Sequence, residues 1–344
     1  MKNKIAFTFL LIFFSLLILS LQQNDSNNSE WPSKVYKIDS TNIDELQFLG
    51  KVLFYDPVLS LDSSTSCSSC HSPFNAFAHT DHALSHGIDN KVGFRNAPAL
   101  FNLAYQPYFM WDGAINHLDM QSLAPITNPD EMDETIAHVV EKLNTQQFYR
   151  TLYYQAFNDS VISGTRTLKA IAAFLTSIES KNAKYDLVMN GEPQFTQQEK
   201  NGFELFSKHC ASCHTPPLFT NYAFESNGLM SDTTLNDDGR IRQTKQTNDS
   251  LKFKVPTLRN IEYTFPYMHD GRYKTLTEVM NHYSNSANKN TLMNPKLKSV
   301  YKLSSNEKVD IIAFLLTLSD EQFLFDKRYA YPKVQIDSLR NINQ

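Results

Sequence analysis

Two copies of the pattern Cys-x-x-Cys-His constrain this chain more than any other feature, and together they contain all four of its cysteines. The first copy is Cys67–His71 and the second is Cys210–His214. In this pattern the two thiols form thioether bonds to a haem, and the adjoining histidine is the proximal ligand of the iron. The sequence therefore predicts two covalently bound c-type haems. They would be held by Cys67, Cys70, His71, Cys210, Cys213 and His214.

Two other uses of paired cysteines explain the pattern less well. Exported proteins often join cysteines in disulfides, so two disulfides are one alternative. Zinc sites built from two Cys-x-x-Cys pairs usually have the pairs ~15–20 residues apart, whereas more than a third of the chain separates Cys70 from Cys210. Neither alternative accounts for a histidine directly after each pair, so haem attachment is favoured.

The N-terminal segment predicts that the protein is exported. Two lysines precede an apolar run, Ile5–Leu21, and a polar tract, Gln22–Glu30, follows directly. This arrangement is typical of a secretion signal, so residues 1–22 are predicted to be a signal peptide and the mature protein to reach the periplasm. The apolar run is also just long enough to serve as an uncleaved N-terminal anchor.

The charge of the chain argues against one class of partner. It has 32 basic and 36 acidic residues, a formal net charge of −4, and its basic residues form no concentrated run. Nucleic-acid-binding proteins need a basic patch or stripe to neutralise phosphates. We therefore expect no nucleic-acid partner, and membrane contact only through an uncleaved N-terminal anchor.

Apolar segments around each motif predict helices. One lies at Ile43–Phe54, before the first motif, and another follows the capping-box pattern Thr196–Glu199, before the second. Far downstream of the two motifs, Ile171–Ile178 resembles Ile311–Leu318, and Ser304–Glu307 is a second capping box. Each motif is thus predicted to have one helix before it and one well after it.

A further repeated segment relates the two halves of the chain. Pro98–Gly113 aligns without gaps with Pro256–Gly271, but Trp111 stands where the second copy has His269. Residues Leu229–Asp249, rich in Asp, Asn and Thr, are typical of a long surface loop. The length of 344 residues suits two domains. We expect a mainly α fold of two tandem cytochrome c-like domains, each around one covalently bound haem c.

Six segments between Leu49 and Leu318 form a specific set. They are Leu49–Pro57, Arg95–Pro98, Trp111–Gly113, Glu131–Met132, Phe253–Asn260 and Pro266–Gly271. In this set the chain resembles the bacterial di-haem cytochrome c peroxidase family, which includes the di-haem enzyme that matures methylamine dehydrogenase. One departure is Ala114, where the family usually has arginine after Trp-Asp-Gly.

The resemblance implies a division of labour between the two haems. Residues 23–190 would form an N-terminal peroxidatic domain, whose haem on His71 meets peroxide. Residues 191–344 would form a C-terminal domain, whose haem on His214 transfers electrons. The division is physically reasonable, because peroxide needs an iron with a free sixth position, whereas rapid electron transfer favours an iron with ligands on both faces.

The family pattern assigns roles to two further residues. Glu131 matches a glutamate beside the peroxide-binding iron, where a carboxylate moves a proton between the peroxide oxygens. Trp111 matches a tryptophan between the two haems, which couples the irons or shares oxidising equivalents as a radical. Without the family pattern, Glu131 has the context of a solvated charge and Trp111 that of a core aromatic residue.

The sixth ligands of the two irons are predicted by counting along the family pattern. The peroxidases usually have Met at the position of Tyr283, and the maturing enzyme has Tyr there. A phenolate stabilises ferric iron and lowers its reduction potential; Met280, His282 and Met293 are the alternatives. His86 is a candidate for a removable ligand of the first iron, although we favour an open first iron with His86 as a plain loop residue.

The resemblance also implies a calcium ion between the two domains. Asn96 through its side chain, and Thr264 and Pro266 through their carbonyls, occupy the matching positions, and such oxygen donors suit Ca²⁺. The alternative for Asn96 is that its side chain caps a turn.

The function implied is that of a periplasmic cytochrome c peroxidase. It would reduce hydrogen peroxide to water with electrons from a small redox protein, a cytochrome c or a cupredoxin, and we allow for a homodimer. One alternative is a di-haem oxidase of the methylamine-dehydrogenase-maturing type, which oxidises a protein or organic substrate. The other is a non-catalytic di-haem electron carrier with both irons capped.

Overall fold

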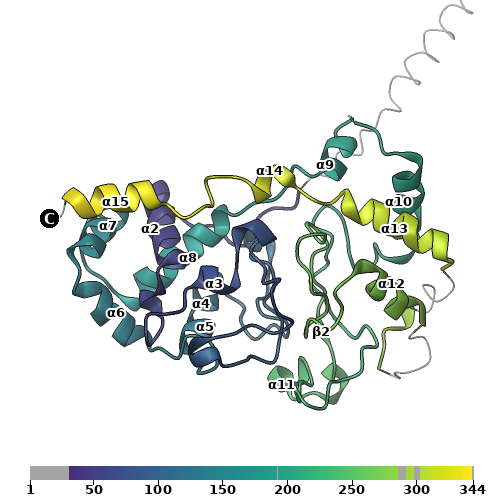
Figure 1. Ribbon diagram of the computed structural model, residues 1–344, viewed down its shortest axis with the longest axis horizontal. Coiled ribbons are helices and arrows are strands. Elements are labelled where there is room, and N and C mark those ends of the chain that lie inside the picture. Colours follow the sequence, from purple (N-terminus) through teal and green to yellow (C-terminus); the bar gives the residue numbers. More distant parts are fainter. Residues whose placement is uncertain (1–30, 192, 286–291, 298–302, 343–344) are drawn as a thin grey trace, which may run out of the picture.

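The computed structural model describes residues 31–191, 193–285, 292–297 and 303–342 (Figure 1). The predicted signal peptide, residues 1–22, lies outside these ranges. Within them, no helix combines the length and the apolar character needed to cross a membrane. This part of the chain is mainly helical, as predicted. Its short strands β1 (Phe224–Glu225) and β2 (Phe253–Lys254) pair antiparallel.

In the first half, helix α2 (Ile43–Tyr55) packs along helix α8 (Gly164–Ser177). Gly50 permits this close approach. A Cβ atom at Gly50 would lie 1.8 Å from the carbonyl oxygen of Ala170 and 3.0 Å from Cβ of Phe174. The helix predicted at Ile43–Phe54 is thus confirmed, and the repeated apolar segment that contains Phe174 belongs to α8.

The second half repeats this arrangement. Helix α10 (Gln197–His209) packs along helix α13 (Ser305–Leu316), and Gly202 lies at their closest approach. A Cβ atom at Gly202 would lie 1.9 Å from the carbonyl oxygen of Asp310 and 2.9 Å from Cβ of Phe314. The two halves therefore share a helix pair in which a glycine of the first helix faces a phenylalanine of the second.

Both predicted capping boxes begin the helices of this second pair. The Thr196 backbone N–H donates to the Glu199 carboxylate at 2.7 Å, and the Glu199 N–H donates back to the Thr196 hydroxyl. Ser304 and Glu307 repeat both contacts at the start of α13. Each box satisfies backbone donors that the first helical turn leaves without partners.

The remaining elements are mostly short. The helices are α3 (Cys67–Cys70), α4 (Leu118–Gln121), α5 (Leu123–Thr127), α6 (Ile136–Asn144), α7 (Gln147–Phe157), α9 (Lys184–Met189), α11 (Ile241–Thr244), α12 (Leu276–Asn285), α14 (Glu321–Leu324) and α15 (Lys333–Ile342). Single 3₁₀ turns lie at Pro57–Leu59, Pro73–Asn75, Ile88–Asn90, Leu103–Tyr105 and Thr247–Asp249.

Two apolar cores form, one around each helix pair, but the chain does not divide between them at a single point. The first core includes three residues that follow the other helix pair in sequence. They are Phe323 of α14, Tyr329 in the connecting segment, and Ile336 of α15. The Tyr329 ring lies 6.0 Å from Phe77, and its carbonyl accepts a 2.6 Å hydrogen bond from Tyr55. Figure 1 shows α15 beside α2 and α7. The domain boundary at residue 190 stays a prediction. The C-terminal segment follows the second domain in sequence but packs in the core of the first.

An ion pair and a backbone hydrogen bond join the two halves. Arg95 binds Asp112 at 3.0 Å within the first half and Asp237 at 2.7 Å in the second. The N–H of Asn96 donates to the carbonyl of His269 at 2.7 Å. The predicted surface loop Leu229–Asp249 is mostly irregular, as expected, but it carries the helix α11 and buries Asp237 at this contact.

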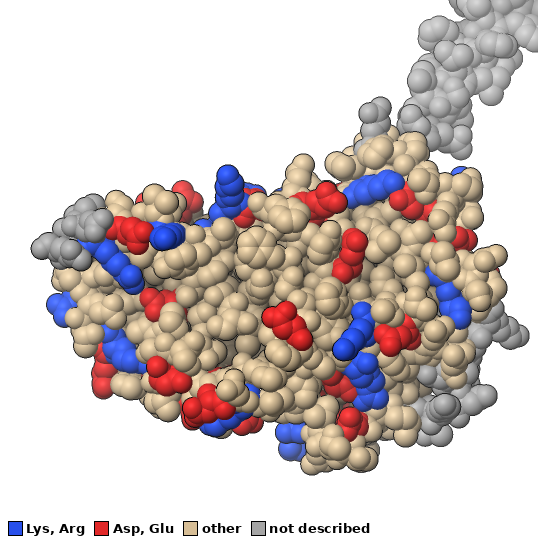
Figure 2. All heavy atoms as spheres, viewed as in Figure 1, with Lys and Arg blue, Asp and Glu red and all other residues tan. Residues whose placement is uncertain are grey.

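The charged side chains on the face shown in Figure 2 agree with the composition. Basic and acidic residues are interspersed over that face, without a patch of one sign. This face therefore offers no surface of the kind that binds phosphate backbones.

Candidate haem sites

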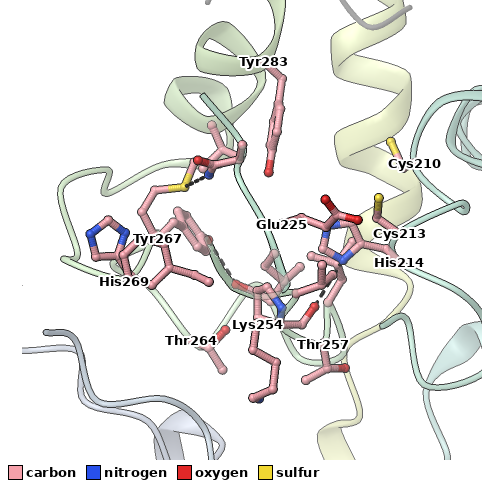
Figure 3. Close-up of a pocket in the computed structure, with 18 of the residues that line it drawn as sticks. Cys210, Cys213, His214, Glu225, Lys254, Thr257, Thr264, Tyr267, His269 and Tyr283 are labelled. Carbon is pink, nitrogen blue, oxygen red and sulfur yellow. Dashed lines mark hydrogen bonds between the residues drawn. The ribbon is translucent and has the colours of Figure 1, made fainter. Parts of the chain in front are cut away.

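The second Cys-x-x-Cys-His motif lies on the wall of a large cavity. Helix α10 ends at His209, with Cys210 as its C-cap residue, and Cys210, Cys213 and His214 all line the cavity, whose volume is about 240 Å³ (Figure 3). All four cysteines of the chain are unpaired, which excludes the disulfide alternative for this structure. Their thiols are therefore available for thioether bonds.

Both motif histidines are held in the same way. The Nδ1 atom of His71 lies 2.8 Å from the carbonyl oxygen of Phe77, and Nδ1 of His214 lies 3.1 Å from that of Pro256. A proton on Nδ1 makes these hydrogen bonds and leaves Nε2 as the metal-binding nitrogen. Burial lowers the pKa of both imidazoles to about 4, so they are neutral, as an iron ligand must be. The donor set fits a c-type haem at each site.

Tyr283 lies across this cavity from the motif. Figure 3 shows its ring descending from α12 with the hydroxyl pointing into the space that Cys210, Cys213 and His214 also face. Burial raises the pKa of Tyr283 to about 12, so the phenolate that ferric iron prefers would form only with a cation in the cavity. The placement is the one that a sixth ligand needs, and the assignment stays a proposal.

The three alternatives to Tyr283 differ in their surroundings. Met280 lines the same cavity. His282 has one ring nitrogen 3.1 Å from the carbonyl of Asn227 and the other 3.3 Å from the Tyr273 hydroxyl. The side chain of Met293 packs against Gly228. Met280 is therefore the main rival.

Glu131 lies beside the first motif. Its carboxylate accepts a 2.8 Å hydrogen bond from the Asn128 side chain, and its carbonyl accepts one from the N–H of Ile88. Burial raises the pKa of Glu131, and its charge contributes, after burial, to a Cys70 pKa of about 11. The carboxyl is thus a partly buried group next to a haem-attaching thiol, which argues against the solvated-charge alternative.

The loop after the first motif brings three histidines together. The ring of His82 lies 5.6 Å from that of His79 and 4.4 Å from that of His86. The carbonyl of His86 is 3.5 Å from the Cys70 thiol, so its backbone borders the first haem site. The imidazole itself stacks on the exposed His82. Iron binding by His86 stays a prediction.

Trp111 lies where the two halves of the chain meet, on the wall of the second-motif cavity. It lines the large cavity and also a smaller space in the first half, bordered by Leu103, Phe109 and Gln121. Its indole N–H donates to the carbonyl of Asn96 at 2.8 Å, and its own carbonyl accepts from the N–H of Lys254 at 2.7 Å. Both halves of the chain therefore fix its position, as an inter-haem role requires.

The three predicted calcium ligands, Asn96, Thr264 and Pro266, border the same cavity. The Asn96 amide N–H₂ group donates to the carbonyl of Ala83 at 3.0 Å, so this hydrogen bond does not use its Oδ1 atom. Among the residues described, no group of three His, Cys, Asp or Glu side chains is arranged so that it could hold a metal ion. A calcium ion here would rely on amide and carbonyl oxygens, and it stays a proposal.

The sequence patterns missed two groups beside Trp111 and Asp112, where the two halves of the chain meet. The guanidinium of Arg240 donates to the carbonyl of Asp112 at 3.0 Å, next to the position where Ala114 departs from the family pattern. The amine of Lys254 borders both cavities. Lys254 belongs to the matching segment Phe253–Asn260, but a lysine in a two-residue strand gives no sign of where its amine points.

Comparison with known proteins finds one matching family model on each half. Residues 44–194 match the family model described as di-haem cytochrome c peroxidase, and residues 199–319 match that of cytochrome c. The methylamine utilization protein MauG of Methylorubrum extorquens is 35% identical over 79% of this chain and 78% of its own length. The cytochrome-c peroxidase IdrP2 of a Pseudomonas species is 31% identical over 81% and 82%.

A third relative and a solved structure extend the comparison. The cytochrome c peroxidase Ccp of Escherichia coli is 36% identical over 66% of this chain and 50% of its own length. The crystal structure of a MauG-like protein associated with microbial copper homeostasis superimposes with a TM-score of 0.81 at 30% identity, and it covers 88% of this chain and 97% of that one. The chain therefore belongs to the di-haem cytochrome c peroxidase family and consists of two tandem cytochrome c-type domains.

Proposed function

We propose that this protein reduces hydrogen peroxide to water at the first haem site. The net reaction consumes two electrons and two protons for each peroxide and releases two water molecules. The electrons would come from a small periplasmic redox protein, a cytochrome c or a cupredoxin, and enter through the second haem. A haem iron with an open coordination position supplies peroxide binding and electron transfer when it is present.

The observation that carries this proposal is the partly buried carboxyl of Glu131 beside Cys70. As a carboxylate it can accept a proton from the peroxide oxygen near the iron, and as a carboxylic acid it can return the proton to the leaving oxygen. The Asn128 amide holds one carboxylate oxygen at 2.8 Å and so orients the group. A pure electron carrier has no use for such a group, which argues against that alternative.

The proposed path between the two sites runs through Trp111. Its ring borders both cavities, and it is held by Asn96 on one side and by the backbone of Lys254 on the other. A fixed aromatic ring at this point shortens the distance over which electrons must pass through saturated protein.

Glu131→Gln tests the acid–base role, with Asp130→Asn as the matched control. Asp130 is the adjacent, exposed carboxylate. Glu131→Gln should keep both haems and lower peroxide turnover by ~10²–10⁴-fold, the usual contribution of a general acid–base group. Asp130→Asn should keep turnover nearly unchanged. Equal rates for Glu131→Gln and the parent protein would return Glu131 to the role of a structural charge.

A second function is favoured by Tyr283, whose hydroxyl points into the cavity opposite His214. A tyrosinate ligand would hold the second haem at a low potential. Both haems could then be oxidised by peroxide in their ferric states and take electrons from a protein or an organic substrate. Peroxide added to the all-ferric protein separates the two functions, because the ordinary peroxidase would react only after partial reduction.

A further inference from the structure

Lys254 borders the cavity of the second haem motif at the point where the two halves of the chain meet. Lys254 ends strand β2, and its backbone N–H is bound to the Trp111 carbonyl at 2.7 Å. Its side chain borders the large cavity of the second motif and the smaller space beside Trp111 in the first half. Figure 3 shows it extending away from Tyr283, toward the side of the cavity opposite α12.

This amine has no carboxylate partner among the residues described. Its Nζ atom donates to the Gln106 side-chain oxygen at 3.0 Å and lies 5.9 Å from the centre of the Tyr222 ring. No Asp or Glu oxygen of the described chain lies within 4.0 Å of it. Burial lowers the pKa of Lys254 to about 8, with no charged neighbour opposing that effect.

Other enclosed cations nearby are paired. Arg95 has two carboxylates, Asp112 and Asp237, and the fully buried Arg259 has Asp186. A cation in a low-dielectric site without a counter-ion is costly, and proteins rarely keep one unless an anion completes the site. The pattern around Lys254 therefore calls for an anion that the polypeptide does not supply.

We propose that the Lys254 ammonium binds a propionate carboxylate of a haem at the junction of the two cavities. Haem propionates are the anions that these cavities would bring to this point. A positive charge there disfavours the ferric state relative to the ferrous state, so Lys254 raises the reduction potential of the haem whose propionate it holds. This role depends on haem binding and is independent of peroxide turnover, so it can hold even if the proposed peroxidase activity fails.

The test compares neutral and charged replacements in the haem-loaded protein. Lys254→Met should keep two haems per chain and lower the midpoint potential of one of them, measured by spectroelectrochemistry. The expected shift is at least a tenfold change in the reduction equilibrium, ~59 mV for a one-electron couple. Lys254→Arg should keep most of the potential. The haem whose spectrum moves identifies which propionate is bound.

Lys252→Met is the matched control, because Lys252 is two residues away and pairs with Asp249 at the surface. It should leave both potentials unchanged. Unchanged potentials in haem-loaded Lys254→Met, or an equal shift in Lys252→Met, would overturn the proposal. If Lys254→Met binds less haem, resonance Raman spectra of the Lys254→Arg variant and the parent protein are compared instead. The propionate bending bands of one haem should shift when ammonium becomes guanidinium, and identical bands would reject the contact.

Discussion

Replacing Asp186 by alanine tests how far one buried ion pair stabilises the structure around the second core. The Arg259 side chain is 0% exposed, and its guanidinium donates to both carboxylate oxygens of Asp186, at 2.6 and 2.8 Å. Its third contact is a 2.6 Å hydrogen bond from Nε to the carbonyl of Pro217. Without Asp186, the buried charge would keep no carboxylate, only that carbonyl and the rings of Trp31 and Phe219.

The expected loss follows from this geometry. Breaking a buried pair by removing one partner costs about 3–5 kcal/mol, because the other charge is left uncompensated. Removing both charges is much less harmful, so Asp186→Leu combined with Arg259→Met should recover most of the loss. The assay is urea denaturation of the haem-loaded protein, followed by circular dichroism and by the absorbance of the haem on His214.

Lys184→Met is the control for this experiment. Lys184 pairs with Glu199 at 2.7 Å on the same part of the fold, but its side chain is 36% exposed. Partly exposed pairs contribute ~0–1 kcal/mol, so this change should have a small effect. If Asp186→Ala costs no more than Lys184→Met, or if the double variant is no better than Asp186→Ala, the argument from the uncompensated charge fails.

Three further outcomes are expected. Tyr283→Met should raise the reduction potential of the second haem in a spectroelectrochemical titration, and an unchanged potential and spectrum would show that Tyr283 is not its ligand. Because burial raises the pKa of Glu131 above its ordinary value, and the carboxylate is the form that accepts a proton, peroxide turnover should rise with pH through a midpoint above the usual carboxyl range. Turnover of the Glu131→Gln variant should lack that rise. Gly202→Ala should destabilise the protein by about 1–3 kcal/mol, because its Cβ would lie 1.9 Å from the Asp310 carbonyl oxygen. Gly93→Ala is the control and should cost little, since the nearest neighbour of its Cβ would be a serine hydroxyl at 3.1 Å. Thermal unfolding measures both effects.

The sequence could predict those features whose cause is local. The haem sites depend on residues within one five-residue pattern, and the capping boxes of Thr196 and Ser304 depend on residues three positions apart. The repeat of Phe174 and Phe314 pointed to the equivalent helices, since each packs against the helix before its motif. The match of Trp111 to the family pattern predicted a position between the two domains, and Trp111 borders both cavities.

The features that could not be predicted arise from contacts between distant segments. Nothing near Asp237 in the sequence indicates that it binds Arg95 across the domain junction, because the surrounding loop has the composition of a solvated segment. The absence of a carboxylate beside Lys254 likewise depends on where distant Asp and Glu side chains lie in the fold, and the sequence does not give those positions. Counting along the loop did not decide whether His86 binds the first iron, for the same reason. The orientation of its ring depends on stacking with His82.

The return of the C-terminal segment to the first core has a consequence for the order in which the protein matures. Phe323 and Tyr329 complete the aromatic cluster around Phe77, close to the motif that contains His71. Ribosomes synthesise these residues only after the entire second domain, although domains generally fold as units from the N-terminus. We therefore expect the first core to stay incomplete until this last segment has docked. Such a delay would leave Cys67 and Cys70 accessible for haem attachment before the core closes.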